Sequence, residues 1–297
     1  MRDPRHYQIL FLGILLSAGA WLRDFSLRPE QVVLTFLAGI STQILCERAR
    51  GGRPKGLLSA VITCFSLTIL LRADNLFAHP AAACGAIASK FLIRFREKHL
   101  FNPGNLGIIA ALLTLPGTWT SPGQWGHDLA FAGWFVALGS LVASRARRAD
   151  TSFIFLSFFL GIAALRVAWL GQAWAVWLHQ LTSGSLLLFA FFMISDPMTI
   201  PDHRRGRVVH GALAATLASA WQYVLFRPNG VLFALFLLAP AVPILDLVWP
   251  APKFAWPSTE PKGVAHVAHS TAEPVPDPAL PASRGGALGH PLPGPTL

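Results

Sequence analysis

Ten apolar stretches follow one another along most of this chain, with short polar segments between them. They cover residues 7–22, 31–46, 56–72, 76–93, 104–118, 127–144, 152–170, 174–195, 207–226 and 230–249. Most of them approach or reach the roughly 17 to 25 residues that a helix needs to cross the hydrocarbon core of a bilayer. The stretch that begins at Gly104 is shorter, which is typical of a broken or tilted helix. We therefore expect an all-α integral membrane protein of about ten transmembrane helices.

The composition indicates that these stretches are surrounded by lipid. Hydrophobic residues make up 53% of the chain and charged residues 13%, whereas a soluble domain usually carries about 25% charged residues. The net charge of +10 comes from short basic clusters and not from one continuous basic face, so we expect no nucleic acid as a partner. The cysteines lack the paired spacing of a metal site, and we expect no metal.

The basic clusters also predict the orientation of the chain. Lys and Arg resist translocation and gather in cytoplasmic connections. With ten spans the basic clusters fall in every second connection, and the connections between them carry few basic residues. We therefore expect a multi-pass protein of the bacterial inner membrane with both termini in the cytoplasm. The clustered residues are Arg48, Arg50, Arg53, Lys55, Arg94, Arg96, Lys98, Arg145, Arg147, Arg148, Arg204, Arg205 and Arg207.

The composition changes after the last apolar stretch. Residues 250–297 are rich in Pro, Ala, Gly and Ser and have little apolar periodicity. Such a segment buries too little apolar surface to offset the entropy lost on ordering. We expect a membrane domain over residues 1–249, whose first apolar stretch is a retained helix, followed by a disordered C-terminal tail over residues 250–297.

The two halves of the membrane domain resemble each other. Residues 101–105, Phe-Asn-Pro-Gly-Asn, are similar to residues 226–230, Phe-Arg-Pro-Asn-Gly, and residues 72–75 are similar to residues 194–197. Because each half would hold five spans, an odd number, equivalent connections lie on opposite sides of the membrane. The pattern predicts an inverted five-plus-five repeat, with one unit at about 7–118 and the other at about 127–249. Such repeats place binding sites at their interface, near interrupted helices.

Two helix starts are predicted beside this interface. Asn102 before Pro103, and Asp196 before Pro197, match an N-cap residue followed by proline at the first helical position. Each would direct the positive end of a helix dipole toward the junction of the repeats. The alternative is that both pairs are ordinary turns between spans.

The segments around these prolines resemble one family. Residues 98–107, Lys-His-Leu-Phe-Asn-Pro-Gly-Asn-Leu-Gly, and residues 191–201, Phe-Phe-Met-Ile-Ser-Asp-Pro-Met-Thr-Ile-Pro, look like two signatures of the NqrB/RnfD family. In this family, NqrB belongs to the sodium-translocating NADH:quinone oxidoreductase and RnfD belongs to the Rnf electron-transport complex. The resemblance extends over about residues 55–248 and implies ten helices in an inverted repeat. The chain is also similar to a compact standalone branch, which includes membrane proteins associated with enediyne biosynthesis.

The resemblance implies a flavin-carrying electron-transport subunit, with coupled ion movement. Family members attach FMN to a threonine in a Ser-Gly-Ala-Thr motif, and the corresponding segment here, residues 118–126, lacks that motif. FMN or riboflavin is therefore expected to bind without a covalent bond. No nicotinamide site, Gly-rich phosphate loop or iron–sulfur ligand set is recognisable, so a redox partner protein or a quinone is expected. If the chain is enzymatic, it is one subunit of an oxidoreductase and not a complete enzyme.

The signatures and the neighbouring charges supply the candidates for cofactor binding. Lys90, Arg94 and Lys98 are four residues apart and would form a basic stripe on one helix. Such a stripe either clamps a flavin phosphate or another anion, or reaches the lipid headgroups as a cytoplasmic anchor. The cofactor-binding candidates are Lys90, Lys98, Asn102, Asn105, Ser195, Asp196 and Thr199.

Three acidic residues are candidates for an ion or proton path, because charged groups inside a membrane are costly and usually functional. Asp246 follows Pro243 in the last span, where a role with cations or protons competes with a capping or interfacial role. Asp74 and Asp196 occupy pseudo-symmetric positions and would serve the two halves of one site.

Further polar residues lie within the apolar stretches. A group on the eighth and ninth stretches would either line a polar path or bond to neighbouring helices. Haem ligation by His79, His179 or His210 is a weaker alternative, because no spacing singles out a pair. The polar group consists of Gln180, Thr182, Ser183, Gln222 and Tyr223.

Three functions follow from these observations. The first is a redox membrane subunit that relays electrons through a non-covalent flavin, and the retained signatures favour it. The second is a cofactor-free transporter or channel on the same scaffold, which the missing flavin-attachment motif favours. The third is a membrane anchor for a redox partner. A flavin in the purified protein would distinguish the first from the other two.

Overall fold

The computed structural model describes residues 3–22, 27–53, 55–96, 98–121 and 129–255. Most of the expected tail lies outside these residues, as does the greater part of the segment 118–126. The described residues belong to one compact unit, Met1–Pro257. All ten apolar stretches contain a helix, so the expectation of a mainly helical protein is confirmed.

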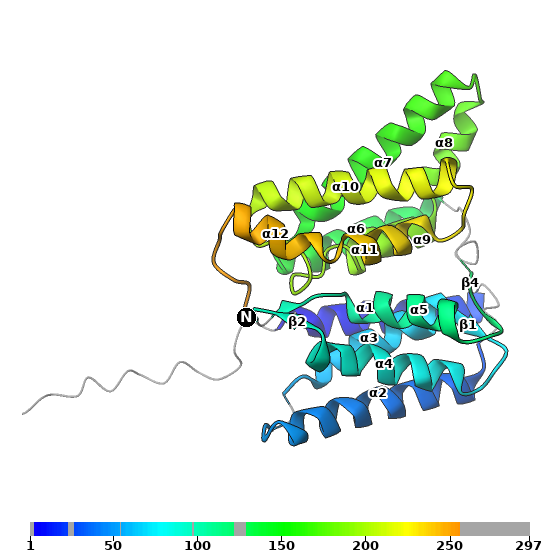
Figure 1. Cartoon of the computed structure of the whole chain (residues 1–297). Helices are drawn as coiled ribbons and strands as arrows, with labels where there is room; N and C mark the ends of the chain where they lie inside the picture. Colours follow the sequence, from blue (N-terminus) through cyan, green and yellow to red (C-terminus); the bar gives the residue numbers. More distant parts are fainter. Residues whose placement is uncertain (1–2, 23–26, 54, 97, 122–128, 256–297) are drawn as a thin grey trace, which may run out of the picture. The chain divides into compact units, whose positions relative to one another are not determined.

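The first half of the chain forms five helices and the four short strands of the described residues (Figure 1). The helices occur in the order in which the apolar stretches occur, and each begins and ends within a few residues of its stretch. The elements are α1 (Pro4–Leu22), α2 (Pro29–Ala49), α3 (Leu57–Leu70), β1 (Leu71–Ala73), α4 (Ala78–Leu92), β2 (Arg94–Phe95), β3 (Lys98–His99), α5 (Pro103–Thr114) and β4 (Thr118–Thr120).

The second half forms the remaining helices (Figure 1). Two of its apolar stretches, the eighth and the tenth, each contain two helices. The elements are α6 (Leu129–Arg145), α7 (Ala149–Trp169), α8 (Trp174–Leu181), α9 (Gly184–Phe192), α10 (Arg204–Tyr223), α11 (Gly230–Leu238) and α12 (Ala241–Val248).

Two expected single spans are wrong in detail, because each is broken. α8 and α9 meet at a bend of 44°, and α11 and α12 meet at a bend of 54°. Ser183 and Gly184 stand at the first break, and Pro240 stands at the second, followed by Pro243 inside the first turn of α12. Proline removes a backbone donor and cannot continue the preceding helix. Hydropathy averaged over a stretch does not register such breaks. The stretch beginning at Gly104, in contrast, is one unbroken helix of 12 residues, α5.

Two helices, α2 and α7, are long and apolar enough to cross a membrane, and up to four spans result if each bent pair counts as one. α3 and α5 are shorter apolar helices. Hydroxyl groups inside α3 are satisfied by the helix itself, since Thr63, Ser66 and Thr68 donate to backbone oxygens four residues earlier. This local bonding lets an apolar environment tolerate them.

Equivalent helices in the two halves have equivalent neighbours. In the first half α1 packs against α3, α2 against α4, and α4 against α5. In the second half α6 packs against α9, α7 against α10, and α10 against α11. The halves meet where α1 contacts α6 and where α5 contacts α11. Both of these helix contacts therefore join a helix to its counterpart in the other half.

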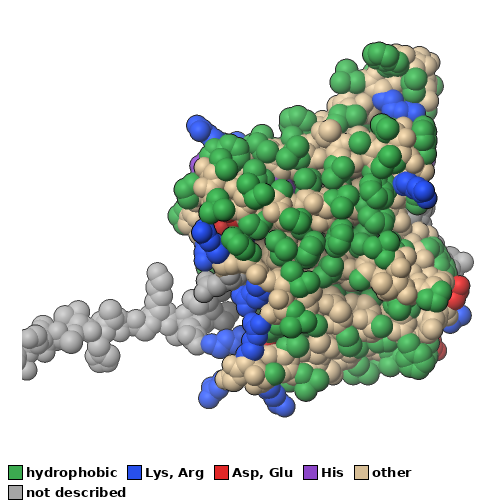
Figure 2. All heavy atoms as spheres, viewed as in Figure 1, with side chains coloured by type: hydrophobic (Ala, Val, Ile, Leu, Met, Phe, Trp, Pro, Cys, Tyr) green, Lys and Arg blue, Asp and Glu red, His purple; other side chains and the backbone are tan. Residues whose placement is uncertain are grey.

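Aromatic and aliphatic side chains fill the core, and many others face outward. The largest fully buried side chains include Phe135, Phe155, Phe159, Phe189 and Phe191. Large apolar side chains are also exposed along the helices, and Figure 2 shows them spread over the visible face, with Lys and Arg gathered mainly at one end. A surface of this kind fits a membrane protein. Exposed examples include Leu37, Leu45, Leu113, Phe158, Leu165, Trp169 and Ile244.

The expected basic stripe on one helix is wrong. α4 ends at Leu92, and the chain then forms a hairpin in which β2 pairs with β3, Arg94 opposite His99. Arg96 makes the turn with a positive φ of 45°. Lys90 consequently lies inside the helix bundle, Arg94 is exposed, and Lys98 belongs to a strand. The spacing of four was compatible with a helix, but the helix ends too early to use it.

Asp196 does not begin a helix, so that part of the prediction is also wrong. The residues after it form a turn, and the next helix, α10, starts at Arg204 with His203 as its N-cap. Pro201 follows Pro197 by four residues and lacks the donor that a helix would need there. Asn102, in contrast, is the N-cap of α5 as expected, with Pro103 in the first helical turn.

Candidate functional site

A small polar pocket lies where α3, the β2–β3 hairpin, α5 and the turn after α9 meet. Its volume is about 60 Å³, which is room for a few water molecules. We call this pocket the polar junction. Its polar lining includes Ser59, Thr63, Ser66, His99, Asn102, Ser195 and Asp196. Residues from both halves of the chain therefore form one site.

Asn102 connects the two halves at this site. Its Oδ1 accepts a hydrogen bond from the backbone N–H of Asn105 over 3.0 Å, which caps α5. Its Nδ2 donates to Asp196 Oδ2 over 3.2 Å. The planar amide thus uses its acceptor within the first half and its donor toward the second.

Asp196 is held by its own turn as well as by Asn102. Its Oδ1 accepts from the backbone N–H of Met198 over 3.1 Å, and its backbone oxygen accepts from Thr199 Oγ1 over 3.3 Å. Burial raises the pKa of this carboxyl above its ordinary value, although these hydrogen bonds and the charge of Lys90 act in the opposite direction. The carboxyl is therefore easier to protonate than an exposed aspartate.

Lys90 reaches the same junction from α4. Its side chain is buried, and its Nζ donates to Ser59 Oγ over 3.1 Å. The ammonium and the Asp196 carboxylate attract each other. A buried ammonium with this environment is costly unless an opposite charge lies nearby. Lys90 and Asp196 therefore stabilise each other between the two halves.

The other predicted residues of the signatures lie around this site. Asn105 is buried at the contact of α5 with α11, where its Nδ2 donates to the backbone oxygen of Leu232 over 3.0 Å. Ser195 is buried and donates to the backbone oxygen of Phe191 over 2.5 Å. Thr199 closes the Asp196 turn. The structure thus gathers Lys90, Asn102, Ser195, Asp196 and Thr199, with Asn105 one turn further into α5.

Lys98 and Asp246 form a second, adjacent cluster. Lys98 Nζ donates to Asp246 Oδ2 over 2.9 Å and to Asp202 Oδ2 over 3.1 Å, and also to the backbone oxygen of Ile200 over 2.7 Å. Asp246 Oδ1 accepts from the backbone N–H of Asp202 over 2.8 Å. Asp246 is therefore engaged in an ion pair that joins the hairpin to α12. Sequence reasoning missed Asp202, because nothing in the chain marks a residue in a turn as the partner of a lysine 104 positions earlier.

Asp74 lies away from these residues. It is exposed at the N-terminal end of α4, where its backbone N–H donates to Gly117 and its backbone oxygen accepts from Arg28. Lys90 and the polar junction are at the C-terminal end of the same helix, which has 15 residues and is therefore about 20 Å long. The structure does not bring Asp74 and Asp196 together into one site.

A larger cavity of about 380 Å³ lies among α7, α8, α9, α10 and α11. Its walls combine apolar side chains, Phe159 and Phe189 among them, with several hydrogen-bonding groups. A volume of this size is within the range of about 300 to 1,000 Å³ that is usual for small-molecule sites. The polar lining includes Thr120, His179, Gln180, Ser183, Ser185, Gln222, Arg227 and Asn229. Gln180, Ser183 and Gln222, predicted to line a polar path, thus line this cavity together.

The larger cavity fits a flavin better than the polar junction does. An isoalloxazine ring needs a wide space with apolar walls and amide or hydroxyl groups at its edge, and the larger cavity offers both. The polar junction has room for water but not for three fused rings. Gln180, Gln222 and Asn229 would hold the polar edge of the ring, and Arg227 would meet a phosphate.

The histidines do not form a pair. His79 is buried on α4 and His210 on α10, and neither ring nitrogen of either residue has a hydrogen-bond partner. His179 lies at the larger cavity instead. Among the residues that the structure describes, no three or more His, Cys, Asp or Glu side chains gather as a metal site would require.

Comparison with known proteins supports the family resemblance. Residues 130–254 match the NQR2, RnfD, RnfE family. This range contains the signature with Ser195, Asp196 and Pro197, whereas the signature with Asn102 lies before it. The resemblance expected from the sequence is confirmed for this part of the chain.

Individual relatives are subunits of an ion-translocating oxidoreductase complex, of the type designated D. The chain is 35% identical over 129 residues to the subunit from Yersinia pseudotuberculosis serotype O:1b (strain IP 31758). This match covers 41% of the chain and 37% of the relative. It is 32% identical over 152 residues to the subunit from Stutzerimonas stutzeri, and this match covers 50% of the chain and 36% of the relative. The chain thus spans little more than a third of the length of these relatives.

Proposed function

We propose that this chain, whose residues 130–254 match the NQR2, RnfD, RnfE family, is a membrane subunit of an electron-transport complex. The relatives in question are subunits of an ion-translocating oxidoreductase complex. By analogy, the chain would act together with a redox partner protein or a quinone. The single observation that carries the proposal is the family match in the half of the chain that forms most of the larger cavity.

The proposal includes ten spans in an inverted five-plus-five repeat. The helix neighbours support it, because they recur in the two halves. The partners of α1, α2 and α4 in the first half are the counterparts of the partners of α6, α7 and α10 in the second half. Counting α8 with α9, and α11 with α12, gives five spans in the second half. The first half has five helices, α1 to α5.

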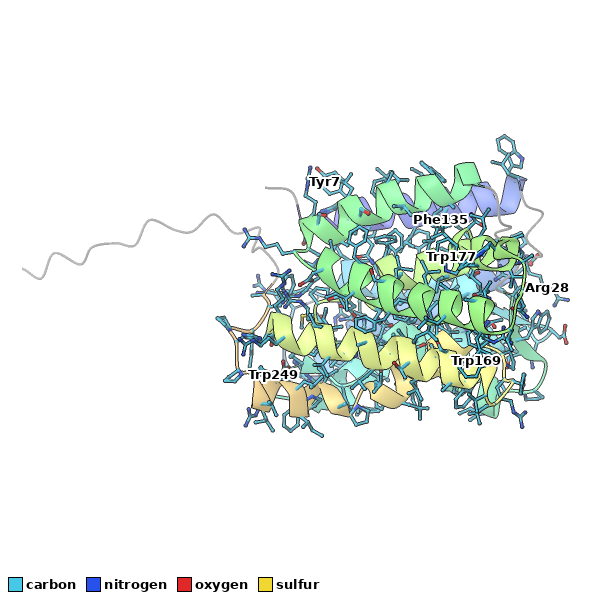
Figure 3. The ribbon with its side chains drawn as sticks, turned by 90° about the horizontal axis from the view of Figure 1, so that it is seen from above. Tyr7, Arg28, Phe135, Trp169, Trp177 and Trp249 are labelled. Carbon is cyan, nitrogen blue, oxygen red and sulfur yellow. The ribbon has the colours of Figure 1, made fainter. Side chains whose placement is uncertain are left out.

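The orientation belongs to the same proposal, with both termini on the cytoplasmic side of a bacterial inner membrane. The basic connections support it, since the start of α1 and the basic end of α6 touch through Arg145 and Tyr7, and Lys253 bonds to Arg96. Aromatic residues are also placed as interfacial anchors would be. In Figure 3, Arg28 and Trp169 lie at one end of the helices, and Tyr7 and Trp249 lie at the other.

A flavin, FMN or riboflavin, would bind in the larger cavity without a covalent bond. Gln180, Gln222 and Asn229 would bond to its polar edge, and Phe159 and Phe189 would exclude water from its faces. A bound flavin would supply one-electron and two-electron transfer. The side chains themselves would orient it and keep it in the protein.

The polar junction would carry the coupled ion movement. Asp196 and Lys90 lie at the contact between the halves, which is where inverted repeats usually bind their substrates. Asp246 and Lys98 lie next to it, and His99 lines both this junction and the pocket beside Asp246. His99 therefore separates the two groups of charged residues and is shared by both pockets.

The test is to purify the full chain in detergent, record its absorption spectrum and release any pigment with acid. A stoichiometric flavin is expected. Gln222→Leu should lower the flavin content severalfold, because it removes a hydrogen-bonding group from the cavity wall. Gln172→Leu is the matched control, because Gln172 is exposed in the turn between α7 and α8 and is not part of the cavity. A colourless protein that mediates solute flux in liposomes would favour a cofactor-free transporter or channel instead.

A membrane anchor for a redox partner is the other alternative. A colourless protein without flux that still retains a partner on membranes would favour it. Flavin content, solute flux and partner retention together distinguish the three functions.

A further inference from the structure

A buried ammonium group lies beside the polar junction. Lys90 is 4% exposed, and its Nζ donates to Ser59, which lines the junction together with Asp196. Among the residues lining the junction, Asp196 is the one that carries a carboxylate. Lys90 therefore already provides a positive charge near this carboxylate, and an entering metal cation would be repelled by it.

The remaining charges around the junction are engaged elsewhere. Arg5 of α1 pairs with Asp3, with 2.5 Å between Nη2 and Oδ2. Glu47 of α2, which also attracts Lys90, accepts from Gln43 and from the backbone N–H groups of residues 55 and 56.

One further titratable group, His99, lines the junction, and another, Cys64, donates to the backbone oxygen of Thr35. Cys64 of α3 lies near Lys90. His99 of β3 is close to both Lys90 and Arg94, and burial together with these two charges lowers its pKa to about 4. Its ring is therefore neutral at neutral pH. Lys90 and Asp196 are the two groups that set the charge of the junction.

We propose that the junction binds a proton at Asp196 and excludes metal cations, because Lys90 repels an entering cation whereas burial favours the neutral form of the carboxyl group. The inference rests on the proposed function and names the ion that this site would handle. The Asp196 carboxylate takes a proton from a hydronium ion in the junction, which gives a neutral carboxyl and a water molecule, and it later returns the proton to water as hydronium. Lys90 remains an ammonium, which Glu47 also attracts, and no other bond forms or breaks.

Space and ligands favour a proton over a metal ion. The junction has about 60 Å³, and both carboxylate oxygens already accept hydrogen bonds, from Met198 and from Asn102. Hard cations need about six or more oxygen ligands and repel a neighbouring ammonium. A proton needs one oxygen and a few water molecules, and the burial of Asp196 favours its protonated form.

The first test measures thermal unfolding of the purified full chain in detergent, with Na⁺, Li⁺ or Ca²⁺ replacing choline at constant ionic strength. The wild-type midpoint should be the same in all of them. In Lys90→Gln an amide oxygen, which can bind a cation, replaces the repelling ammonium, so Na⁺ should raise the midpoint by several degrees relative to choline. Adding Asp196→Asn to that variant should abolish the effect, and Lys90→Arg should behave as the wild type. Saturable stabilisation of the wild type by a metal cation, abolished by Asp196→Asn, would overturn the proposal.

The second test follows the carboxyl group directly by infrared difference spectra during a pH titration of the same protein. A protonated carboxyl band should appear with an apparent pKa above that of an exposed aspartate, and Asp196→Asn should remove it. Glu30→Gln, an exposed residue at the start of α2, should leave it unchanged. Absence of the band from the wild type contradicts the proposal. Neither test measures flavin or electron transfer. A colourless protein would contradict the proposed function, whereas a junction that binds a metal cation would contradict this inference.

Discussion

Asn102 and Asp196 are joined by a hydrogen bond of 3.2 Å between Nδ2 and Oδ2, although 94 positions separate them in the chain. Through its Oδ1 the same Asn102 side chain caps α5. One residue therefore fixes the start of a helix in the first half and the turn of the second half. A change at either residue alters the local structure of both halves.

Replacing Asn102 with Ala should destabilise the protein. The substitution removes the N-cap of α5, which costs about 1 kcal/mol, and leaves Asp196 without one of its donors. Thermal unfolding in detergent should show a midpoint lower by several degrees. Asn75→Ala is the control, since Asn75 bonds within an exposed turn at the opposite end of α4. Equal effects of the two variants would contradict the linking role of Asn102.

Replacing Asp196 with Ala should leave membrane insertion intact and abolish activity. Insertion depends on the apolar helices, whereas Asp196 lies in a turn between α9 and α10 and supplies the carboxylate of the polar junction. The measurements are the amount of protein in the membrane fraction and electron transfer by the assembled complex. Glu30→Gln should retain both. Normal activity of the Asp196→Ala variant would remove this residue from the site.

Replacing Lys98 with Met should weaken the contact between the hairpin and α12. The substitution leaves the carboxylates of Asp202 and Asp246 close together without their shared cation. Breaking a largely buried pair of this kind costs on the order of 3 kcal/mol. The thermal midpoint should fall, and Lys98→Arg should restore part of it. If the double variant Lys98→Met/Asp246→Leu is no more stable than Lys98→Met alone, the repulsion between the carboxylates is not the cause.

The helices themselves were predictable from the sequence, but some of their connections were not. Each helix that the structure describes overlaps one of the ten apolar stretches, and the Asn-Pro pair at residue 102 located the start of α5. The breaks before Gly184 and at Pro240 were marked by Ser, Gly and Pro, yet the apolar stretches run through them. Ser, Gly and Pro residues inside an apolar stretch indicate where a helix is interrupted, whereas the average hydropathy of the stretch does not.

The candidate site was only partly predictable. Asn102 and Asp196, one from each signature, are joined by a hydrogen bond in the structure, and the family resemblance had pointed to both as candidates. The ion pair of Lys98 with Asp246 joins positions 148 apart, and no local pattern encodes such a distance. The larger cavity is formed by five helices, so its existence depends on packing and not on any motif.

Stability should decrease as the pH falls below about 6.5, because of His99. Burial, together with the charges of Lys90 and Arg94, lowers the pKa of His99 from 6.5 to about 4 in the folded protein. Between these values the unfolded chain binds a proton at this residue and the folded chain does not, so acid favours unfolding. The contribution of neutral His99 to the free energy of unfolding is complete above pH 6.5 and is lost as the pH falls toward 4. His99→Gln should flatten this part of the curve of thermal midpoint against pH.

Reporter fusions should place residues near 50 and near 205 on the same side of the membrane. The end of α2 lies beside the end of α4, since Arg50 bonds to the backbone oxygen of Phe91. The start of α10 lies beside the start of α7, since Arg207 pairs with Asp150 over 2.7 Å. Basic residues are exposed at both places, and each would resist translocation. Fusions near residues 75 and 172 should report the opposite side, because one helix separates each from a basic end. Finding residues 50 and 205 on different sides would contradict the inverted arrangement, since an even number of spans must separate them.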